Sequence, residues 1–368
     1  MINISCEKII LGPEGKNTPP KFHSSSFATL LDSIRYAEDL PALAGAIITD
    51  DTILDANAVG SRRYGGEANI TINDKFHLGS DTKAITAVLL GILVDEGLVN
   101  WTTTLPNIFP EYANVMRPEY KEVTLYNILS HSAGFMRDPN LTLHTTSESD
   151  QRAEVVEWVV QQPAVMQKGH YLYSNLGYIV AGAIAEKLTN RNYEDILIER
   201  VLRPLGITSA GFGPMGTVGM EDQPLQHTTS HTPVEPTADA DNHPIYSPAG
   251  RLHMSIKDWA KYIQWVLAAE AEYQNLLKPE TAAMLTASII HDDGGGYYAL
   301  GWGITNQLLA GGRTLSHAGS NGFNYAIAWL APGKRFGVIL ATNQGPGTSA
   351  NPLNSAATRL IEYHLNGR

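Results

Sequence analysis

The segment KFHLGSDTKAITAVLLGILVDEG, residues 75–97, constrains the fold of this chain more than any other stretch. From Ala84 to Val94 nearly every residue is apolar, so a helix formed here has no solvent-facing side and is expected to be buried. Lys83 nevertheless lies in the first turn of that helix, one turn after Ser80. A lysine there opposes the helix dipole and loses hydration near a core. The sequence therefore raises the question of what compensates for Lys83.

Two interpretations of the Ser80–Lys83 pair are open. In the first, the spacing is a coincidence and Lys83 extends its ammonium to water. In the second the pair is catalytic, because a serine hydroxyl is a weak nucleophile that needs an adjacent base, and positions i and i+3 share a helix face. The helix amino terminus favours negative charge at Ser80 and lowers the expected pKa of Lys83. A catalytic pair also requires a proton shuttle and an oxyanion hole elsewhere in the chain.

Length and composition indicate a globular protein. The 368 residues are enough to bury a large core in one two-lobed unit or two domains, and 43% of them are hydrophobic against 17% charged. The net charge of −11 argues against nucleic acid and anionic membrane surfaces as partners. We expect no membrane span, because no apolar run reaches about 18 residues. Nothing in the sequence specifies an oligomeric state.

The amino-terminal segment MINISCEKIILGPEGKNTPP has neither the basic start nor the long apolar run of a signal peptide. A cytoplasmic protein is therefore expected, with removal of a signal from a longer precursor as the alternative. Cys6 is the only cysteine, which excludes an intramolecular disulfide.

Hydrophobic periodicity and turn residues predict the elements along the chain. Helices are expected at 27–40, 125–134, 153–162, 175–191, 193–206 and 351–365, the last with Asn351 as a possible cap and Pro352 at its first position. Strands are expected at 42–51, 52–60, 311–322, 324–333 and 335–343, and a loop at 211–244. Strands near both ends with helices between them predict an α/β (α+β) fold. We expect a sheet lobe of residues 1–78 plus 290–368 and an inserted, mainly helical lobe of residues 79–289.

A candidate for the proton shuttle lies in KGHYLYSNLGYIVAG, just before an apolar helix. A tyrosine phenol held beside a lysine ammonium is favoured in its ionised form and can pass protons, which is the role we consider for Tyr173. The structural alternative is that Tyr173 is one of 16 tyrosines and that Asn175 caps the following helix. The two roles of Asn175 are compatible.

A candidate for the oxyanion hole lies in the expected strand TLSHAGSNGF. Its small residues Ala318, Gly319 and Ser320 permit close approach of a substrate, and a strand N–H can donate to an oxyanion. His317 precedes them. The alternative for His317 is a surface histidine at a strand end.

Together, S-x-x-K at 80–83, Y-S-N at 173–175 and H-A-G at 317–319 resemble the three motifs of the penicillin-recognising serine hydrolases. This superfamily includes class C β-lactamases, D-alanyl-D-alanine peptidases, D-amino-acid amidases and related carboxylesterases. The Y-S-N motif is similar to that of the class C and esterase-like branch. Further similar segments, such as LYNILSHSAGF and YSPAGRLHMSIKDWAKYI, extend the resemblance over nearly the whole chain. It implies a β-lactamase/transpeptidase-like fold with an antiparallel sheet flanked by helices.

The resemblance also implies roles for single residues. Ser80 is the expected acylated nucleophile, and Lys83 is expected to activate it. Tyr173 is expected to act as general base or acid. Asn175 is expected to contact the substrate amide or to order the Lys83 ammonium.

By the same resemblance, the backbone N–H groups of Ser80 and Ser320 form the oxyanion hole, and His317 and Gly319 help to orient the substrate. Neither a metal nor an organic cofactor is implied. Three further histidines in the polar loop have no regular ligand spacing, so we do not interpret them as a zinc site: His227, His231 and His243.

His317 is the main departure from the family pattern, because β-lactamases of this branch carry lysine at its position. That lysine is a permanent cation for a substrate carboxylate, whereas histidine is mostly neutral at pH 7, so carboxylate recognition is expected to be weak and pH-dependent. This favours an esterase or amide hydrolase acting on a small-molecule ester, amide or β-lactam substrate. The alternatives are a D-stereospecific peptidase or penicillin-binding protein, a class C-like β-lactamase, an acyltransferase and an inactive binding scaffold.

Overall fold

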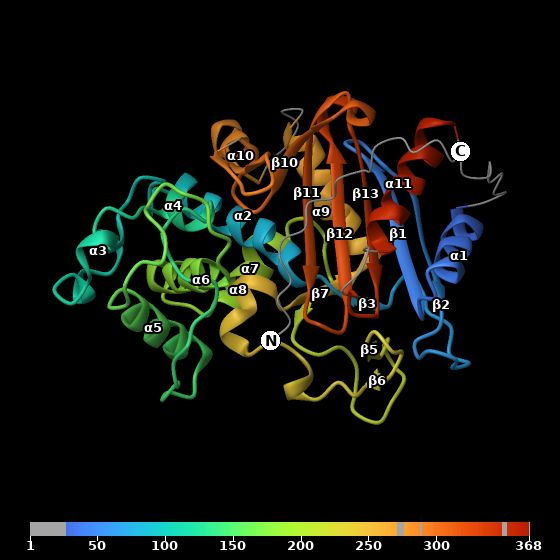
Figure 1. The fold of residues 1–368 in the computed structure, drawn as a ribbon, viewed down its shortest axis with the longest axis horizontal. Helices are drawn as coiled ribbons and strands as arrows, with labels where there is room; N and C mark the ends of the chain where they lie inside the picture. Colours follow the sequence, from blue (N-terminus) through green and yellow to red (C-terminus); the bar gives the residue numbers. More distant parts are fainter. Residues whose placement is uncertain (1–26, 271–275, 288, 348–351, 368) are drawn as a thin grey trace.

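The computed structural model describes residues 27–270, 276–287, 289–347 and 352–367. The amino-terminal segment on which the expected cytoplasmic location depends, Cys6 and the possible cap Asn351 lie outside these ranges. The described residues form a half rich in helices and a half built around a sheet, which Figure 1 shows side by side.

An antiparallel sheet of eight strands lies within the described residues, in the order β2–β1–β13–β12–β11–β10–β9–β8. The strands are β1 (Ala42–Thr49), β2 (Ile53–Gly60), β8 (Ile290–His291), β9 (Tyr297–Tyr298), β10 (Gly303–Gln307), β11 (Gly312–Ser320), β12 (Tyr325–Ala331) and β13 (Phe336–Thr342). This confirms the expected fold class, with a sheet that takes strands from both ends of the chain.

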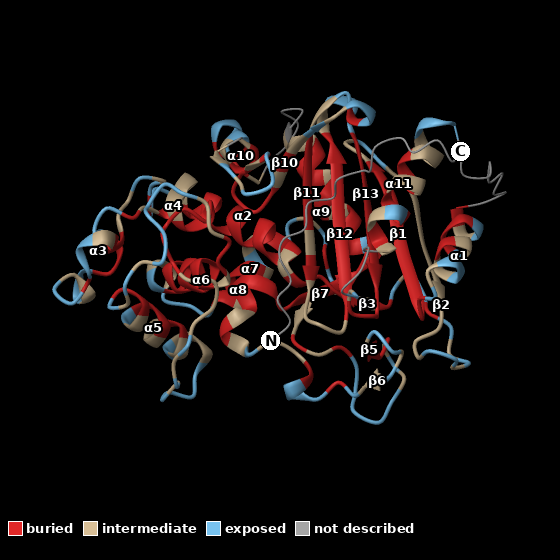
Figure 2. Ribbon diagram, in the orientation of Figure 1, coloured by how far each residue is buried: buried red, intermediate tan, exposed pale blue. Residues whose placement is uncertain are grey.

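Helices cover both faces of the sheet. The terminal helices α1 (Phe27–Ala37) and α11 (Pro352–Leu365) pack on one face, and α9 (Ile256–Glu270) packs on the other (Figure 1). Alternate β12 side chains enter the two cores, Tyr325, Ile327 and Trp329 on the α1 side and Ala326 and Ala328 on the α9 side. Both faces of β1, β12 and β13 are buried (Figure 2), so these strands are apolar along nearly their whole length instead of alternating.

The helix-rich half surrounds α2 (Thr82–Asp95), which is buried along nearly its whole length as its apolar sequence predicts. The other helices are α3 (Leu105–Ile108), α4 (Leu125–Leu129), α5 (Glu148–Val159), α6 (Asn175–Thr189), α7 (Tyr193–Leu197), α8 (Ser247–Gly250) and α10 (Pro279–Thr286). A small antiparallel sheet pairs β3 (Lys75–His77) and β4 (Gly211–Phe212) with β7 (Leu252–Ser255), and another pairs β5 (Gln226–His227) with β6 (Pro233–Val234).

Several predicted element bounds were wrong. The helix expected over 125–134 ends at Leu129, because His131 adopts a left-handed backbone with φ 59°. The helix expected from 193 to 206 changes after Leu197 into a π-helical turn. The expected loop 211–244 contains the short strands β4, β5 and β6.

The division into lobes of residues 1–78 plus 290–368 and 79–289 stays a proposal. The helix α9 belongs to the second range by sequence, yet it packs against β1 and β13 of the sheet. No helix within the described ranges is long and apolar enough to cross a membrane.

Candidate active site

The expected nucleophile lies in a tight turn that contacts the sheet. Ser80 is the middle residue of a 3-10 turn, Gly79–Asp81, that leads directly into α2. A Cβ atom at Gly79, which has φ 51°, would lie 2.1 Å from the Ser320 nitrogen, and one at Gly319 would lie 2.4 Å from the Ser80 nitrogen. Only glycine therefore permits this direct backbone contact between the turn and β11. The contact brings the backbone nitrogens of Ser80 and Ser320 near each other.

The side chain of Lys83 is completely buried, so the interpretation that it extends to water is wrong. Its Nζ atom donates to Ser80 Oγ at 3.1 Å, to Asn175 Oδ1 at 2.8 Å and to the Ala249 carbonyl at 2.7 Å. These three acceptors match the three N–H donors of an ammonium group. The cost of burying the lysine is thus offset by charge-assisted hydrogen bonds, one of which ends on the proposed nucleophile.

Tyr173 lies beside this lysine. Its side chain is buried, and the centre of its ring is 4.9 Å from Lys83 Nζ. The ring of Tyr178, on α6, lies on the same ammonium at 5.6 Å. Two electron-rich rings and a buried cation form a cation–π arrangement.

Asn175 does not cap α6. The capping residue is Ser174, whose Oγ accepts from the Gly177 N–H at 3.0 Å. The side chain of Asn175 instead joins two charged residues, since its Oδ1 accepts from Lys83 and its Nδ2 donates to Asp138 Oδ1 at 2.9 Å. Asn175 therefore contacts the Lys83 ammonium, and its expected role in ordering that group stays a proposal. Asp138 was not recognised from the sequence.

His131 is a second residue of the site that sequence reasoning missed. Its ring contacts those of Tyr173 and Tyr298, with centroid distances of 4.4 and 4.7 Å, and its Nδ1 accepts from the Ser174 N–H at 3.1 Å. Burial, followed by the charge of Lys83, holds the pKa of His131 well below its usual range. The neutral ring of His131 therefore packs against the ring of Tyr173. The family-like segment LYNILSHSAGF was the only sequence signal, and it did not specify this contact.

His317 is buried on β11 and is not a surface histidine. Its Nε2 lies 3.2 Å from the Tyr298 hydroxyl. Burial, with a smaller contribution from the positive charge of Lys83, lowers the pKa of His317 to about 3. The expected weak and pH-dependent charge at this position is therefore corrected to a neutral side chain throughout the physiological pH range.

The three histidines of the polar loop make structural contacts. The Nδ1 of His227 lies 2.9 Å from the Asn343 carbonyl, the ring of His231 stacks on Tyr64, and His243 accepts from the Ile245 N–H. Across the described ranges, no three His, Cys, Asp or Glu side chains are grouped so as to hold a metal ion.

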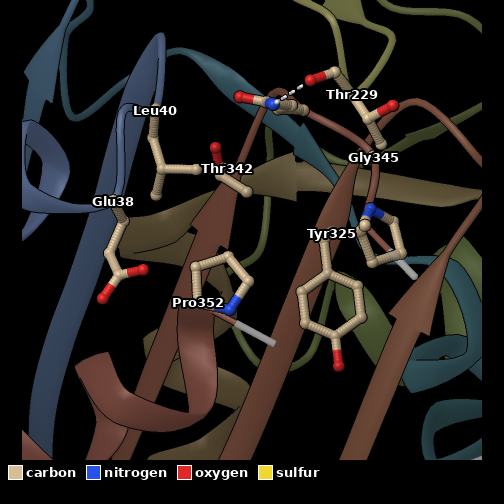
Figure 3. Close-up of a pocket in the computed structure, with 10 residues that line it drawn as sticks. Glu38, Leu40, Thr229, Tyr325, Thr342, Gly345 and Pro352 are labelled. Carbon is tan, nitrogen blue, oxygen red and sulfur yellow. Dashed lines mark hydrogen bonds between the residues drawn. The ribbon is translucent and has the colours of Figure 1, made fainter. Parts of the chain in front are cut away.

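A separate hollow of about 200 Å³ lies beside the start of β12 and the end of β13 (Figure 3). Its lining includes Glu38, Leu40, Tyr325 and Thr342. Tyr325 belongs to the core on the α1 side of the sheet, and none of the expected site residues lines this hollow.

The fold and the arrangement of serine, lysine and tyrosine are those of a serine hydrolase of the β-lactamase type. The family model described as Beta-lactamase matches residues 27–362, and the chain belongs to this family.

Three comparisons illustrate the relationship. The chain is 28% identical over 343 residues to "Unguisins hydrolase ungD'" of Aspergillus campestris, an alignment that covers 85% of this chain and 60% of the relative. It is 26% identical to "Penicillin-binding protein 4" of Amycolatopsis lactamdurans, with 89% of this chain and 87% of the relative covered. The octameric penicillin-binding protein homologue from Pyrococcus abyssi superposes with a TM-score of 0.74 at 22% identity, over 92% of this chain and 76% of that chain. The chain thus spans less than two thirds of the fungal hydrolase.

Proposed function

We propose that this protein hydrolyses small ester or amide substrates through an acyl-enzyme on Ser80. The observation that carries the proposal is the 3.1 Å contact between Lys83 Nζ and Ser80 Oγ, made by a fully buried lysine. A buried lysine on a serine hydroxyl supports an activated nucleophile, and the tyrosine ring beside it supports a proton path.

In the proposed first step, Ser80 Oγ bonds to the carbonyl carbon of the substrate and gives its proton to the Tyr173 phenolate, which the Lys83 ammonium stabilises. The carbonyl oxygen takes the negative charge and accepts from the N–H groups of Ser80 and Ser320. When the bond to the alcohol or amine breaks, Tyr173 returns the proton to that leaving group. Water then attacks the acyl-enzyme by the same proton path, which releases the acid and restores the Ser80 hydroxyl.

The proposed substrate class follows from His317. A side chain that is neutral at pH 7 provides no fixed cation, so a substrate carboxylate is not required for binding. In this proposal His317 and Asn175 orient the substrate and Gly319 leaves room for it. The cytoplasmic location expected from the amino-terminal segment remains part of the proposal.

A second candidate is hydrolysis of an amide bond in a peptide, including D-stereospecific peptidase activity. One relative is named a penicillin-binding protein, and penicillin is a cyclic amide, so this name favours an amide substrate. A class C-like β-lactamase and an acyltransferase would use the same acyl-enzyme. The buried Lys83 on Ser80 argues against an inactive scaffold, because such a scaffold has no use for a costly buried cation.

The first test is covalent labelling with a fluorescent phosphonate, followed by a panel of p-nitrophenyl esters, D-amino-acid amides and nitrocefin. Ser80→Ala should abolish labelling and turnover, while the loss of one hydroxyl at a helix start costs at most about 1–2 kcal/mol of stability. The control is Ser33→Ala on α1, which removes a hydroxyl bonded to the Leu30 carbonyl and should leave the rate unchanged. Turnover by Ser80→Ala above roughly a tenth of the wild-type rate would contradict the acyl-enzyme.

A further inference from the structure

Asp241 joins two segments that are far apart in the sequence. It lies in the loop before α8, and its side chain is completely buried. One neighbour is His77 on β3, also buried, whose Nε2 is 3.1 Å from the carboxylate. The other is Asn321, which directly follows β11 and donates from Nδ2 to Asp241 Oδ1 at 3.1 Å. The Asn242 N–H donates to the same oxygen at 2.7 Å.

The His77 branch leads to the nucleophile turn. The Gly79 N–H donates to His77 Nδ1 at 3.1 Å, so this nitrogen is the acceptor of the ring. The ring proton is then on Nε2, which donates to Asp241. The chain of contacts from Asp241 through His77 therefore ends on the residue before Ser80.

The Asn321 branch leads to the other proposed oxyanion donor. Asn321 Oδ1 accepts from the Asn324 N–H at 3.0 Å and so closes the turn that follows Ser320. Its Nδ2 donates to Gln226 Oε1 at 3.0 Å as well as to Asp241. The position of the end of β11 thus depends on the same carboxylate as the position of the nucleophile turn.

Burial acts to raise the pKa of Asp241, but the contact with His77 and the hydrogen bond of Asn321 lower it overall. The Arg251 guanidinium, whose Nε is 3.7 Å from Asp241 Oδ2, places a positive charge beside the same carboxylate. The group that joins the two branches is therefore a carboxylate, and charge-assisted hydrogen bonds to it are stronger than neutral ones.

We propose that Asp241 is a positioning residue that sets the spacing between the backbone N–H groups of Ser80 and Ser320. The inference rests on the proposed function, in which these two groups stabilise the oxyanion. An oxyanion hole requires both donors at about 2.7–3.1 Å from the charged oxygen, and here the donors belong to different segments. A buried carboxylate bonded to the neighbours of both donors holds them in register before the substrate arrives.

The test compares a p-nitrophenyl ester with the matching thionoester. Sulfur accepts hydrogen bonds weakly, so the preference of the enzyme for the oxygen ester measures its oxyanion hole. Asp241→Asn should lower kcat by about tenfold or more, because loss of one complete donor costs about 10²–10³-fold. In the same variant, the preference for the oxygen ester over the thionoester should fall by a factor similar to the fall in kcat, while KM changes by less than about threefold.

His77→Asn provides a second variant, since the Oδ1 of the new side chain can still accept from the Gly79 N–H while the contact with Asp241 is lost. It should lower the preference for the oxygen ester in the same way. If Asp241→Asn does not fold, this variant tests the positioning role instead. The matched control is Asp258→Asn, a buried carboxylate that accepts from the Thr208 and Ser209 N–H groups at 2.8 Å. It should lower the Tm and leave the ester preference unchanged.

Two outcomes separate the inference from the function on which it rests. If Asp241→Asn and His77→Asn are folded and keep the wild-type ester preference, the positioning role is wrong and the acyl-enzyme proposal stands. If the wild-type protein is neither labelled by the phosphonate nor active on any ester, both are overturned together.

Discussion

Asp81, the residue after the proposed nucleophile, is a buried acid without the hydrogen-bond partners that Lys83 has. Its side chain is only 3% exposed, and neither carboxylate oxygen has a hydrogen-bond partner among the described residues. Burial raises the pKa of Asp81 well above 3.8, and the nearby charge of Lys83 opposes this shift only in part. The folded protein therefore holds a proton on Asp81 at pH values where the unfolded chain has released it.

This proton makes stability depend on pH. The unfolded carboxyl ionises near pH 3.8, so above that value the wild type loses unfolding free energy as the pH rises toward the raised pKa of the folded state. Asp81→Asn has no proton to lose, so its stability relative to wild type should increase with pH by at most about 1.4 kcal/mol per unit. Urea unfolding of both proteins across this pH range measures the difference.

The control for this measurement is Asp258→Asn. Burial acts to raise the pKa of Asp258, but its hydrogen bonds with Lys261 and Ser209 lower it overall. The wild type is therefore stabilised by this carboxylate above pH 3.8 and loses that contribution as the pH falls, the opposite sign to Asp81. A stability difference for Asp81→Asn that does not vary with pH would show that Asp81 is not buried as a neutral acid.

At the scale of elements, the site depends on how closely β11 approaches the turn before α2. The backbone makes close contact between them at Gly79 and Gly319. Larger residues are excluded at Gly79 and Gly319 because their Cβ atoms would clash with the facing backbone, and this reason does not involve a substrate. The same contact brings a strand from the carboxyl-terminal part of the sheet to Ser80, the proposed nucleophile, at the edge of the helix-rich half.

Gly319→Ala should move β11 away from the turn before α2. Its Cβ would lie 1.9 Å from the Leu78 carbonyl oxygen and 2.4 Å from the Ser80 nitrogen, so the backbone must move. We expect kcat to fall by about 10²-fold or more, since a displacement of 1 Å at a catalytic group has that effect. Steady-state kinetics on a p-nitrophenyl ester provide the measurement.

The control is Gly333→Ala, whose Cβ would have its nearest neighbours at 3.9 Å. This variant should change stability by less than about 0.5 kcal/mol and leave kcat unaltered. A Gly319→Ala enzyme with wild-type kcat would show that close approach of β11 is not needed for activity.

At the scale of the whole molecule, buried ionic groups join segments that are distant in sequence. Arg152 on α5 is fully buried and pairs with Glu186 on α6 at 2.6 Å and with Glu194 on α7 at 3.0 Å. It also donates to the carbonyl of Pro244, in the loop that carries Asp241. One guanidinium therefore links three helices to the loop behind the proposed oxyanion hole.

Arg152→Met should destabilise the protein by about 3–5 kcal/mol, because it leaves buried carboxylates without a counter-charge. Adding Glu186→Gln should recover part of that loss, since it removes one of the unpaired charges. Urea unfolding of the single and double variants tests both statements. A loss below about 1 kcal/mol for Arg152→Met would mean that water reaches these carboxylates and solvates them.

The sequence by itself predicted the elements and motifs that depend on local pattern. The apolar run after Lys83 required a buried helix, because no face of it was polar, and the central strands were recognisable by length and β-branched content. The order of the three motifs predicted the antiparallel, family-like fold that the comparisons bear out. The Ser80–Lys83 contact was also predictable, because residues three positions apart on a helix share a face.

Only the tertiary structure determined the burial, the protonation state and the hydrogen-bond partners of the side chains in the proposed site. The sequence left open whether His317 is a surface histidine, whereas the structure makes it buried and neutral because β11 packs inside the sheet beside Lys83. The link from Asp241 to His77 joins residues 164 positions apart, and no local pattern marks it. Burial, pKa and hydrogen-bond partners depend on atoms brought together by the whole chain, so a motif can identify a residue without specifying its environment.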